Sequence, residues 1–161
     1  MVVSQPENAG DSYAYTEYLT QVVKDLRRSI DYLETRPDID SERLAYYGMS
    51  WGGYLGSIIP AVEERFGVSV LVAGGLTGAG RPEVRDLNYV TRVRTPTLIL
   101  NGRYDVFFPA ETSSQPMLDL LGTPAEHKRL ILYETDHIPP RTEYIKETLA
   151  WLDKYLGPVG R

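Results

Sequence analysis

Three residues of this sequence could together carry out acyl transfer: a serine, a histidine and an aspartate. Ser50 lies in Gly48-Met49-Ser50-Trp51-Gly52, which has the pattern G-x-S-x-G. A serine hydroxyl is a weak nucleophile unless a base takes its proton, and the base needs a carboxylate to orient it. His137 is the candidate base, since the chain has one other histidine, and Asp105 is the candidate carboxylate. We therefore expect Ser50, Asp105 and His137 to form a catalytic triad.

The G-x-S-x-G pattern indicates a nucleophile only where a strand leads into it and a helix follows it. An apolar run at residues 44–47 is typical of a buried strand, and apolar residues recur at helical spacing over residues 51–64. The sequence thus predicts a strained strand-to-helix turn that exposes the hydroxyl of Ser50. Gly48 and Gly52 are expected to let this turn close, because neither carries a Cβ.

Residues next to the predicted turn are candidates for substrate contact. A helix N-terminus favours negative charge, because its first N–H groups have no partner within the helix. We therefore expect the backbone N–H of Trp51 to be one oxyanion donor. The side chains of Trp51, Tyr104 and Phe107 are candidates for the wall of the substrate pocket, with packing as the alternative reason for each.

The elements that must position these residues follow from the same periodicity. Continuously apolar segments predict three more strands, at residues 68–73, 96–100 and 130–133. Helical spacing predicts four helices, at residues 13–35, 51–64, 110–121 and from Pro139-Pro140 to about 156. Pro60 is expected to bend the second of them. The last is expected to face inward with Ile145, Leu149, Leu152 and Leu156. Such strands, separated by helices, imply a parallel sheet covered on both faces. Ser50, Asp105 and His137 each follow a strand, so we expect them at the carboxyl edge of the sheet.

Length and composition narrow the classes of function. The 161 residues predict one domain at residues 13–161, preceded by a flexible lead-in at residues 1–12. A net charge of −5 argues against nucleic-acid partners and against an anionic membrane surface. With no cysteine and two histidines, the chain offers no thiolate nucleophile or disulfide, and we expect no metal or cofactor. The sequence shows no signal-peptide pattern and no long apolar run, so a cytoplasmic location is expected.

Each candidate residue has a plainer interpretation. Ser50 could be a small residue in a glycine-rich turn, Asp105 a turn aspartate and His137 a capping or loop histidine. Asp136 is a rival for the acid, but a residue adjacent to the base is expected to point elsewhere. His127 has charged neighbours and is interpreted as a solvated loop residue.

With these residues in place, the chain resembles the α/β-hydrolase superfamily, and within it the branch with prolyl-oligopeptidase-like and dienelactone-hydrolase-like members. The resemblance covers about residues 17–156. It is carried by Asp38-Ile39-Asp40 with Arg43, by residues 48–54, by residues 95–102 with Asp105 and Pro109, and by Asp136-His137 with Trp151-Leu152. The order serine, aspartate, histidine along the chain is also the order of that fold.

The same comparison shows what this sequence lacks. The superfamily fold normally has eight strands, and a loop ahead of the serine, often His-Gly-Gly, supplies the second oxyanion donor. Here about four strands resemble strands 5–8, and no His-Gly-Gly precedes Ser50. The resemblance therefore implies a truncated catalytic domain, a C-terminal half whose serine strand lies at an exposed sheet edge. Three alternatives stay open: a homodimer paired through that edge, a fragment that needs an N-terminal half, or a truncated remnant.

The sequence predicts a serine hydrolase that works through an acyl-enzyme, most simply a carboxylesterase for small soluble acyl esters. A serine peptidase of the oligopeptidase-like branch, acting on short peptides, is the first alternative. The second alternative is a catalytically weak half-domain that works by association with a partner or an N-terminal region, since each lost oxyanion donor costs about 10²–10³ in rate.

Overall fold

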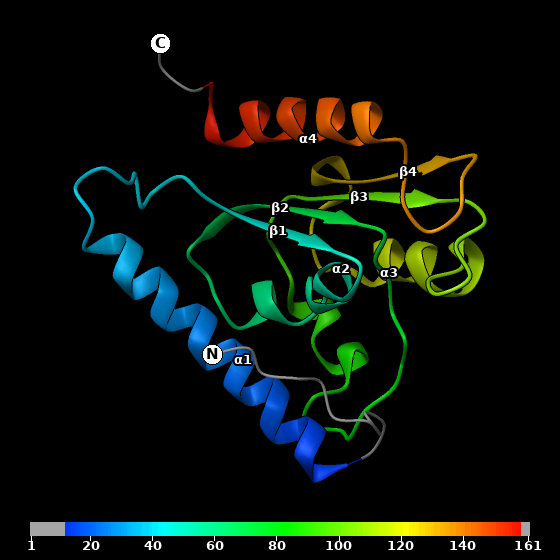
Figure 1. The fold of residues 1–161 in the computed structure, drawn as a ribbon, viewed down its shortest axis with the longest axis horizontal. Helices are drawn as coiled ribbons and strands as arrows, with labels where there is room; N and C mark the ends of the chain where they lie inside the picture. Colours follow the sequence, from blue (N-terminus) through cyan, green and yellow to red (C-terminus); the bar gives the residue numbers. More distant parts are fainter. Residues whose placement is uncertain (1–11, 159–161) are drawn as a thin grey trace.

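The core of the molecule is a four-stranded parallel sheet, seen in a computed structural model that describes residues 12–158 (Figure 1). The strands pair in the order β1-β2-β3-β4, every neighbouring pair is parallel, and their bounds are Leu44–Met49, Phe66–Val72, Thr97–Gly102 and Lys128–Tyr133. The predicted partial α/β fold, with a parallel sheet of about four strands flanked by helices, is confirmed. The predicted lead-in lies outside the described residues except for Ser12.

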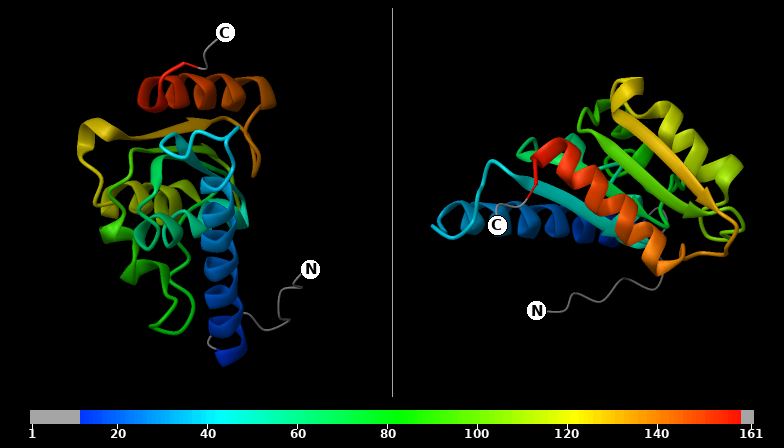
Figure 2. Two further views of the ribbon diagram at one scale, coloured as in Figure 1. Left: turned by 90° about the vertical axis from the view of Figure 1, so that its left-hand side faces the viewer. Right: turned by 90° about the horizontal axis from the view of Figure 1, so that it is seen from above.

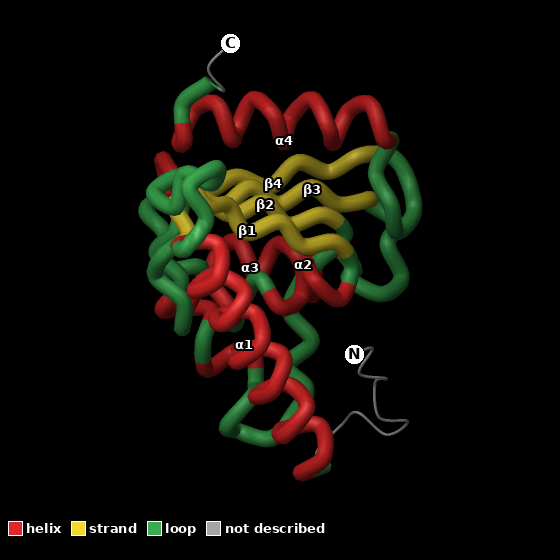
Figure 3. Tube along the Cα trace, turned by 60° about the vertical axis from the view of Figure 1, so that its left-hand side comes forward, coloured by secondary structure: helices red, strands yellow, loops and turns green. Residues whose placement is uncertain are grey.

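Helices cover both faces of this sheet, as Figures 2 and 3 show. The longest helices are α1 (Tyr13–Glu34) and α4 (Arg141–Leu156), and two short ones are α2 (Trp51–Leu55) and α3 (Gln115–Leu120). Helix α4 lies over one face, whereas α1, α2 and α3 lie on the other. Among residues 12–158, no helix combines the length and apolar character that crossing a bilayer requires.

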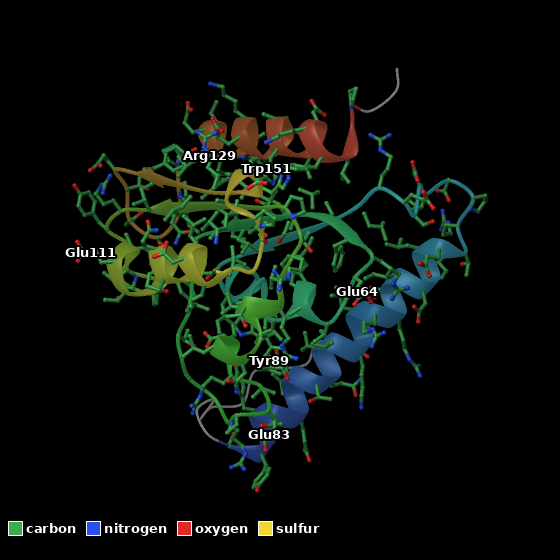
Figure 4. The ribbon with its side chains drawn as sticks, turned by 180° about the vertical axis from the view of Figure 1, so that it is seen from behind. Glu64, Glu83, Tyr89, Glu111, Arg129 and Trp151 are labelled. Carbon is green, nitrogen blue, oxygen red and sulfur yellow. The ribbon has the colours of Figure 1, made fainter. Side chains whose placement is uncertain are left out.

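The central strands are buried on both sides, which explains their continuous apolar runs. Toward α4, valines and leucines of β2 and β3 pack with Trp151, which Figure 4 shows between α4 and the strands. Toward α1 and α2, Leu71 and Ile99 are fully buried in a second cluster. The candidate residue Asp105 follows the end of β3, one of these two buried strands.

Helix α1 matches the prediction closely. The side chain of Ser12 caps it by accepting a hydrogen bond from the backbone N of Tyr15 at 3.2 Å. Leu19 and Ile30 on its apolar stripe are buried. The helix ends at Glu34, shortly before Pro37, whose ring disfavours helical backbone in the residue before it.

One predicted helix is wrong in extent, and a second has the predicted extent but a different type of first turn. The helix predicted at 51–64 is only the five-residue α2, followed by a separate 3₁₀ turn at Ile59–Ala61 that contains Pro60. Helix α2 is followed by Gly56, which packs so closely on the sheet that a Cβ would overlap the side chain of Leu71. The helix predicted at 110–121 begins with a π-helical turn at Ala110–Ser114 before α3.

The predicted inward face of the last helix is half right, since Leu152 and Leu156 pack toward the sheet and the other two residues do not. Ile145 and Leu149 are exposed, at 39% and 56% of their surface. Beside the two leucines, the face that packs on the sheet carries Thr148 and three aromatic side chains, Tyr144, Trp151 and Tyr155. Aromatic rings bury more apolar area than aliphatic side chains, and their polar tips can remain at the surface. The burial of these rings favours a helix rotation that turns Ile145 and Leu149 away from the sheet.

Strand β1 lies at one end of the strand order, and within residues 12–158 its only sheet partner is β2. The side chain of Tyr47, in the middle of this strand, is 48% exposed. Helix α4 packs mainly on β2 and, to a lesser extent, on β3. The predicted exposed edge at the serine strand is therefore present in the described part of the chain.

Candidate active site

Ser50, Asp105 and His137 follow the carboxyl ends of β1, β3 and β4. In a parallel sheet these ends share one edge, which is where open α/β sheets place their sites. The three residues come from distant parts of the sequence, and the structure brings their side chains into hydrogen-bonding contact.

The serine occupies a strained turn between β1 and α2. Its φ of 55° and ψ of −112° lie in a region that L-residues rarely adopt. The turn is held on both sides, because the Ser50 N–H donates to the carbonyl of Val72 at 2.8 Å and its carbonyl accepts from the N–H of Tyr54 at 2.9 Å. These bonds fix the backbone of Ser50 and therefore the direction of its Cα–Cβ bond.

Only one of the two motif glycines is needed for closure. A Cβ on Gly48 would overlap the carbonyl oxygen of Gly52, so this position requires glycine. A Cβ on Gly52 would meet no atom within 4 Å, which corrects the expectation that both glycines prevent a clash.

A chain of two hydrogen bonds joins the three candidate residues. Nε2 of His137 lies 2.9 Å from Oγ of Ser50, and Nδ1 of the same ring lies 2.8 Å from Oδ2 of Asp105. A carboxylate only accepts, so Nδ1 donates to Asp105, and Nε2 of the neutral ring is left as an acceptor for the serine proton. This arrangement can make Ser50 a nucleophile.

The candidate acid is fixed by its own loop. Asp105 is 2% exposed, and its Oδ1 accepts hydrogen bonds from the backbone N–H groups of Phe107 at 2.8 Å and Phe108 at 3.1 Å. Both carboxylate oxygens are therefore used, one by the loop and one by His137. Asp136, the rival acid in the sequence, is exposed.

The loops that carry the acid and the base lie directly against each other. Gly102 packs under the histidine loop so closely that a Cβ would overlap the carbonyl oxygen of Asp136. The N–H of Arg103 donates to the carbonyl of Tyr133 at 2.7 Å, and the N–H of Tyr104 donates to that of Thr135 at 3.0 Å. The distance between acid and base is thus set by backbone contacts.

Two of the three pocket candidates lie beside the triad. The ring of Phe107 meets the imidazole of His137 edge-on at 5.0 Å between centroids, and the side chain is 69% exposed. Trp51 directly follows Ser50, and its ring packs on Tyr18 of α1 at 5.7 Å. The backbone N–H of Trp51 lies in the first turn of α2, where we expected an oxyanion donor.

Tyr104 occupies a different position. Its hydroxyl donates to Oε2 of Glu134 at 2.7 Å, and Arg103 bonds the other carboxylate oxygen at 2.6 Å. These two hydrogen bonds lower the pKa of Glu134, and the one from Tyr104 has the larger effect. Tyr104 lines a groove of about 460 Å³ whose wall includes Arg103, Glu111 and Leu132 but no triad residue.

Comparison with known proteins identifies the family. The sequence model of the dienelactone hydrolase family matches residues 4–137, well over half of the chain. The chain belongs to the dienelactone hydrolase family.

Relatives of this dienelactone hydrolase family member are longer proteins. The α/β-hydrolase domain-containing protein WAV2 of Arabidopsis thaliana is 26% identical over 55% of this chain and 38% of its own. A cold-adapted esterase from an Arctic intertidal metagenomic library is 25% identical with a TM-score of 0.69, over 85% of this chain and 59% of that one. An acetyl xylan esterase from Paenibacillus sp. R4 has the same fold (TM-score 0.70, 19% identity) over 86% of this chain and 54% of its own. This chain thus spans roughly half the length of these relatives.

Sequence reasoning missed the residues that support the site. These are Gly102, which packs under the histidine loop, and Phe108, whose N–H binds Asp105. The Asn-Gly pair after an apolar strand was the available signal, but it also marks ordinary turns.

Proposed function

We propose that this chain is a serine hydrolase that cleaves small carboxylic esters through Ser50, His137 and Asp105. The observation that carries the proposal is the pair of hydrogen bonds that links the serine hydroxyl to the imidazole, at 2.9 Å, and the imidazole to the buried carboxylate, at 2.8 Å. Membership of a hydrolase family and the likeness to esterases support the choice of reaction.

The first half-reaction transfers the acyl group to the enzyme. Oγ of Ser50 attacks the ester carbonyl while Nε2 of His137 takes the hydroxyl proton, and the carbonyl oxygen becomes an oxyanion near the N–H of Trp51. His137 then gives its proton to the leaving alcohol oxygen as the ester bond breaks. Asp105 holds the ring in place and stabilises the imidazolium throughout.

The second half-reaction regenerates the enzyme. A water gives a proton to His137 and attacks the acyl carbonyl, the bond to Oγ breaks, and His137 returns the proton to Ser50. The product acid leaves. Because His137 protonates the leaving alcohol, Phe107 beside its ring is placed to contact that part of the substrate.

The deciding experiment is hydrolysis of p-nitrophenyl acetate and butyrate by the purified chain and by S50A. We expect turnover that S50A reduces to background while circular dichroism shows an unchanged fold. Turnover that survives in S50A would contradict the proposal.

A second candidate function is supported by the length of the relatives and by the open edge of β1. The chain spans 59% or less of the relatives described above, and its serine strand has one partner among residues 12–158. A half-domain that becomes active only on association would hydrolyse esters at the background rate when it is by itself. Once its partner is supplied, it would show turnover that depends on Ser50.

A further inference from the structure

Asn101 is a buried polar residue for which the reaction above has no use. It lies near the carboxyl end of β3 and is fully buried. Its side-chain amide makes two hydrogen bonds to one residue that is 27 positions away: Nδ2 donates to the carbonyl of Gly74 at 2.8 Å, and Oδ1 accepts from the N–H of Gly74 at 3.1 Å. A polar side chain is costly to bury unless such bonds satisfy it.

The amide of Asn101 takes the place of a strand partner. The N–H of Ala73, just beyond β2, still bonds the carbonyl of Leu100 at 2.9 Å, but its positive φ of 52° turns the chain away from β3. The N–H and carbonyl of buried Gly74 would then lack a backbone partner in β3. A side-chain amide can replace one, since it has a donor and an acceptor, whereas a carboxylate only accepts and an aliphatic side chain does neither.

Gly74 in turn supports the nucleophile elbow. A Cβ on Gly74 would lie 2.5 Å from the carbonyl carbon of Gly53, and a Cβ on Gly53 would lie 2.8 Å from Cα of Gly74. The two backbones are therefore in direct contact, and Gly53 belongs to the first turns of α2. The same end of β2 also holds the elbow through the bond between the N–H of Ser50 and the carbonyl of Val72.

We propose that Asn101 is a positioning residue for the serine: its amide fixes Gly74 against Gly53, and this contact sets the place of the first turn of α2 with the hydroxyl of Ser50 and the N–H of Trp51. The role in rate rests on the proposed function, but the mechanical link from Asn101 to α2 does not. Loss of the amide should let Gly74 move and widen the turn that carries Ser50. The serine hydroxyl would then still be present but displaced from its position against His137.

Thr97 provides a matched control for a purely structural effect. It lies four positions earlier on β3, on the same face, and is also fully buried, with its Oγ1 donating to the carbonyl of Thr95 at 2.8 Å. It is at the amino end of the strand, away from the elbow. T97V should lower the melting temperature without affecting the serine.

The test compares N101L and T97V with the wild-type chain by two independent measurements. The first is amide hydrogen exchange at Gly74 and at Tyr54, whose N–H bonds the carbonyl of Ser50 at 2.9 Å. The second is the rate of Ser50 labelling by a fluorophosphonate, together with kcat and KM for p-nitrophenyl acetate. For N101L we expect faster exchange at both amides, labelling and kcat lowered about tenfold or more, and KM changed less than twofold.

The possible outcomes decide whether Asn101 positions the serine. An N101L protein that labels and turns over like the wild type, or whose faster exchange is confined to Gly74, overturns the inference. If N101L does not fold, G74A tests the same contact with the amide retained, because its Cβ would press on Gly53, and it should give the same kinetic signature. A folded wild-type chain that neither labels nor hydrolyses esters refutes the proposed function, and the exchange of Tyr54 in N101L then decides the mechanical link alone.

Discussion

The carboxylate of Asp105 shows how tightly the site is determined at the level of single residues. One oxygen accepts two backbone N–H groups, and the other bonds Nδ1 of His137. With both oxygens occupied, the carboxylate cannot rotate without losing a hydrogen bond, so it presents one acceptor to the ring in one direction. The tautomer of His137 that can accept a proton from Ser50 follows from this fixed acceptor.

We expect D105N to lower kcat for p-nitrophenyl acetate by about 10³–10⁴, because an amide that donates to Nδ1 would favour the wrong imidazole tautomer. D136N is the control. It removes the neighbouring carboxylate, which is exposed, and should change kcat less than threefold. Circular dichroism should show the same fold for both variants. Equal losses of kcat in the two variants would mean that Asp105 does not have the role of acid.

The three residues proposed as a triad could be picked from the sequence because acyl transfer needs particular residue types, and the chain offers few of them. Their supports could not be picked in this way. The need for glycine at Gly102 arises from a carbonyl 34 positions later, at Asp136, and the role of Asn101 arises from a backbone 27 positions earlier, at Gly74. Such contacts depend on how strand ends meet in space, which spacing along the chain does not encode.

At the level of elements, strands were predicted more accurately than helix lengths. An apolar run buried on both faces indicates a strand directly, as in β2 and β3. The extent of α2 is decided instead by tertiary packing, since Gly56 brings the helix end against Leu71, and Pro60 starts a separate turn. The segment after α2 keeps turn-type backbone hydrogen bonds as far as Glu63, and a charged contact at that residue holds it as well.

That charged contact centres on Glu63, which is 3% exposed. Arg65 donates to both of its carboxylate oxygens, at 2.6 and 2.8 Å, and also bonds Asp31 and Glu34 of α1. The hydrogen bonds from the Arg65 guanidinium lower the pKa of Glu63 to about 2. The segment that leads into β2 is thereby tied to α1.

This lowered pKa predicts a pH dependence of stability. The carboxylate stabilises the folded chain fully above its unfolded pKa of about 4.3, and the contribution is lost as the pH falls toward 2. We expect E63Q to lower the free energy of unfolding by about 2 kcal/mol at pH 7, and the difference from wild type to shrink between pH 5 and pH 2. Urea unfolding at a series of pH values measures it. A difference that is constant with pH, or one that E64Q at the exposed neighbour reproduces, would argue against this origin.

At the level of the whole molecule, the main feature is that the serine strand is also the edge strand. Alternate residues of a parallel strand direct their N–H and C=O groups to opposite sides. The N–H of Ser50 points toward β2 and bonds the carbonyl of Val72. The backbone N–H and C=O groups of Ala45, Tyr47 and Met49 therefore point away from β2. Strand β1 carries neither a charged residue nor a proline, the residues that protect the edges of natural sheets. The side chain of Tyr47 adds exposed apolar surface to this strand.

An unprotected edge of this kind is expected to recruit a strand, and a second copy of the chain can supply one by pairing antiparallel about Tyr47. We therefore expect self-association of the wild-type chain in sedimentation velocity at increasing concentration, and its loss in Y47K, since lysine on an edge opposes pairing. Y32K is the control, because Tyr32 is also exposed but lies on α1. Self-association that Y32K and Y47K weaken equally would place the interface elsewhere. A wild-type chain that stays monomeric would leave the edge for a different chain, which is what a half-domain requires.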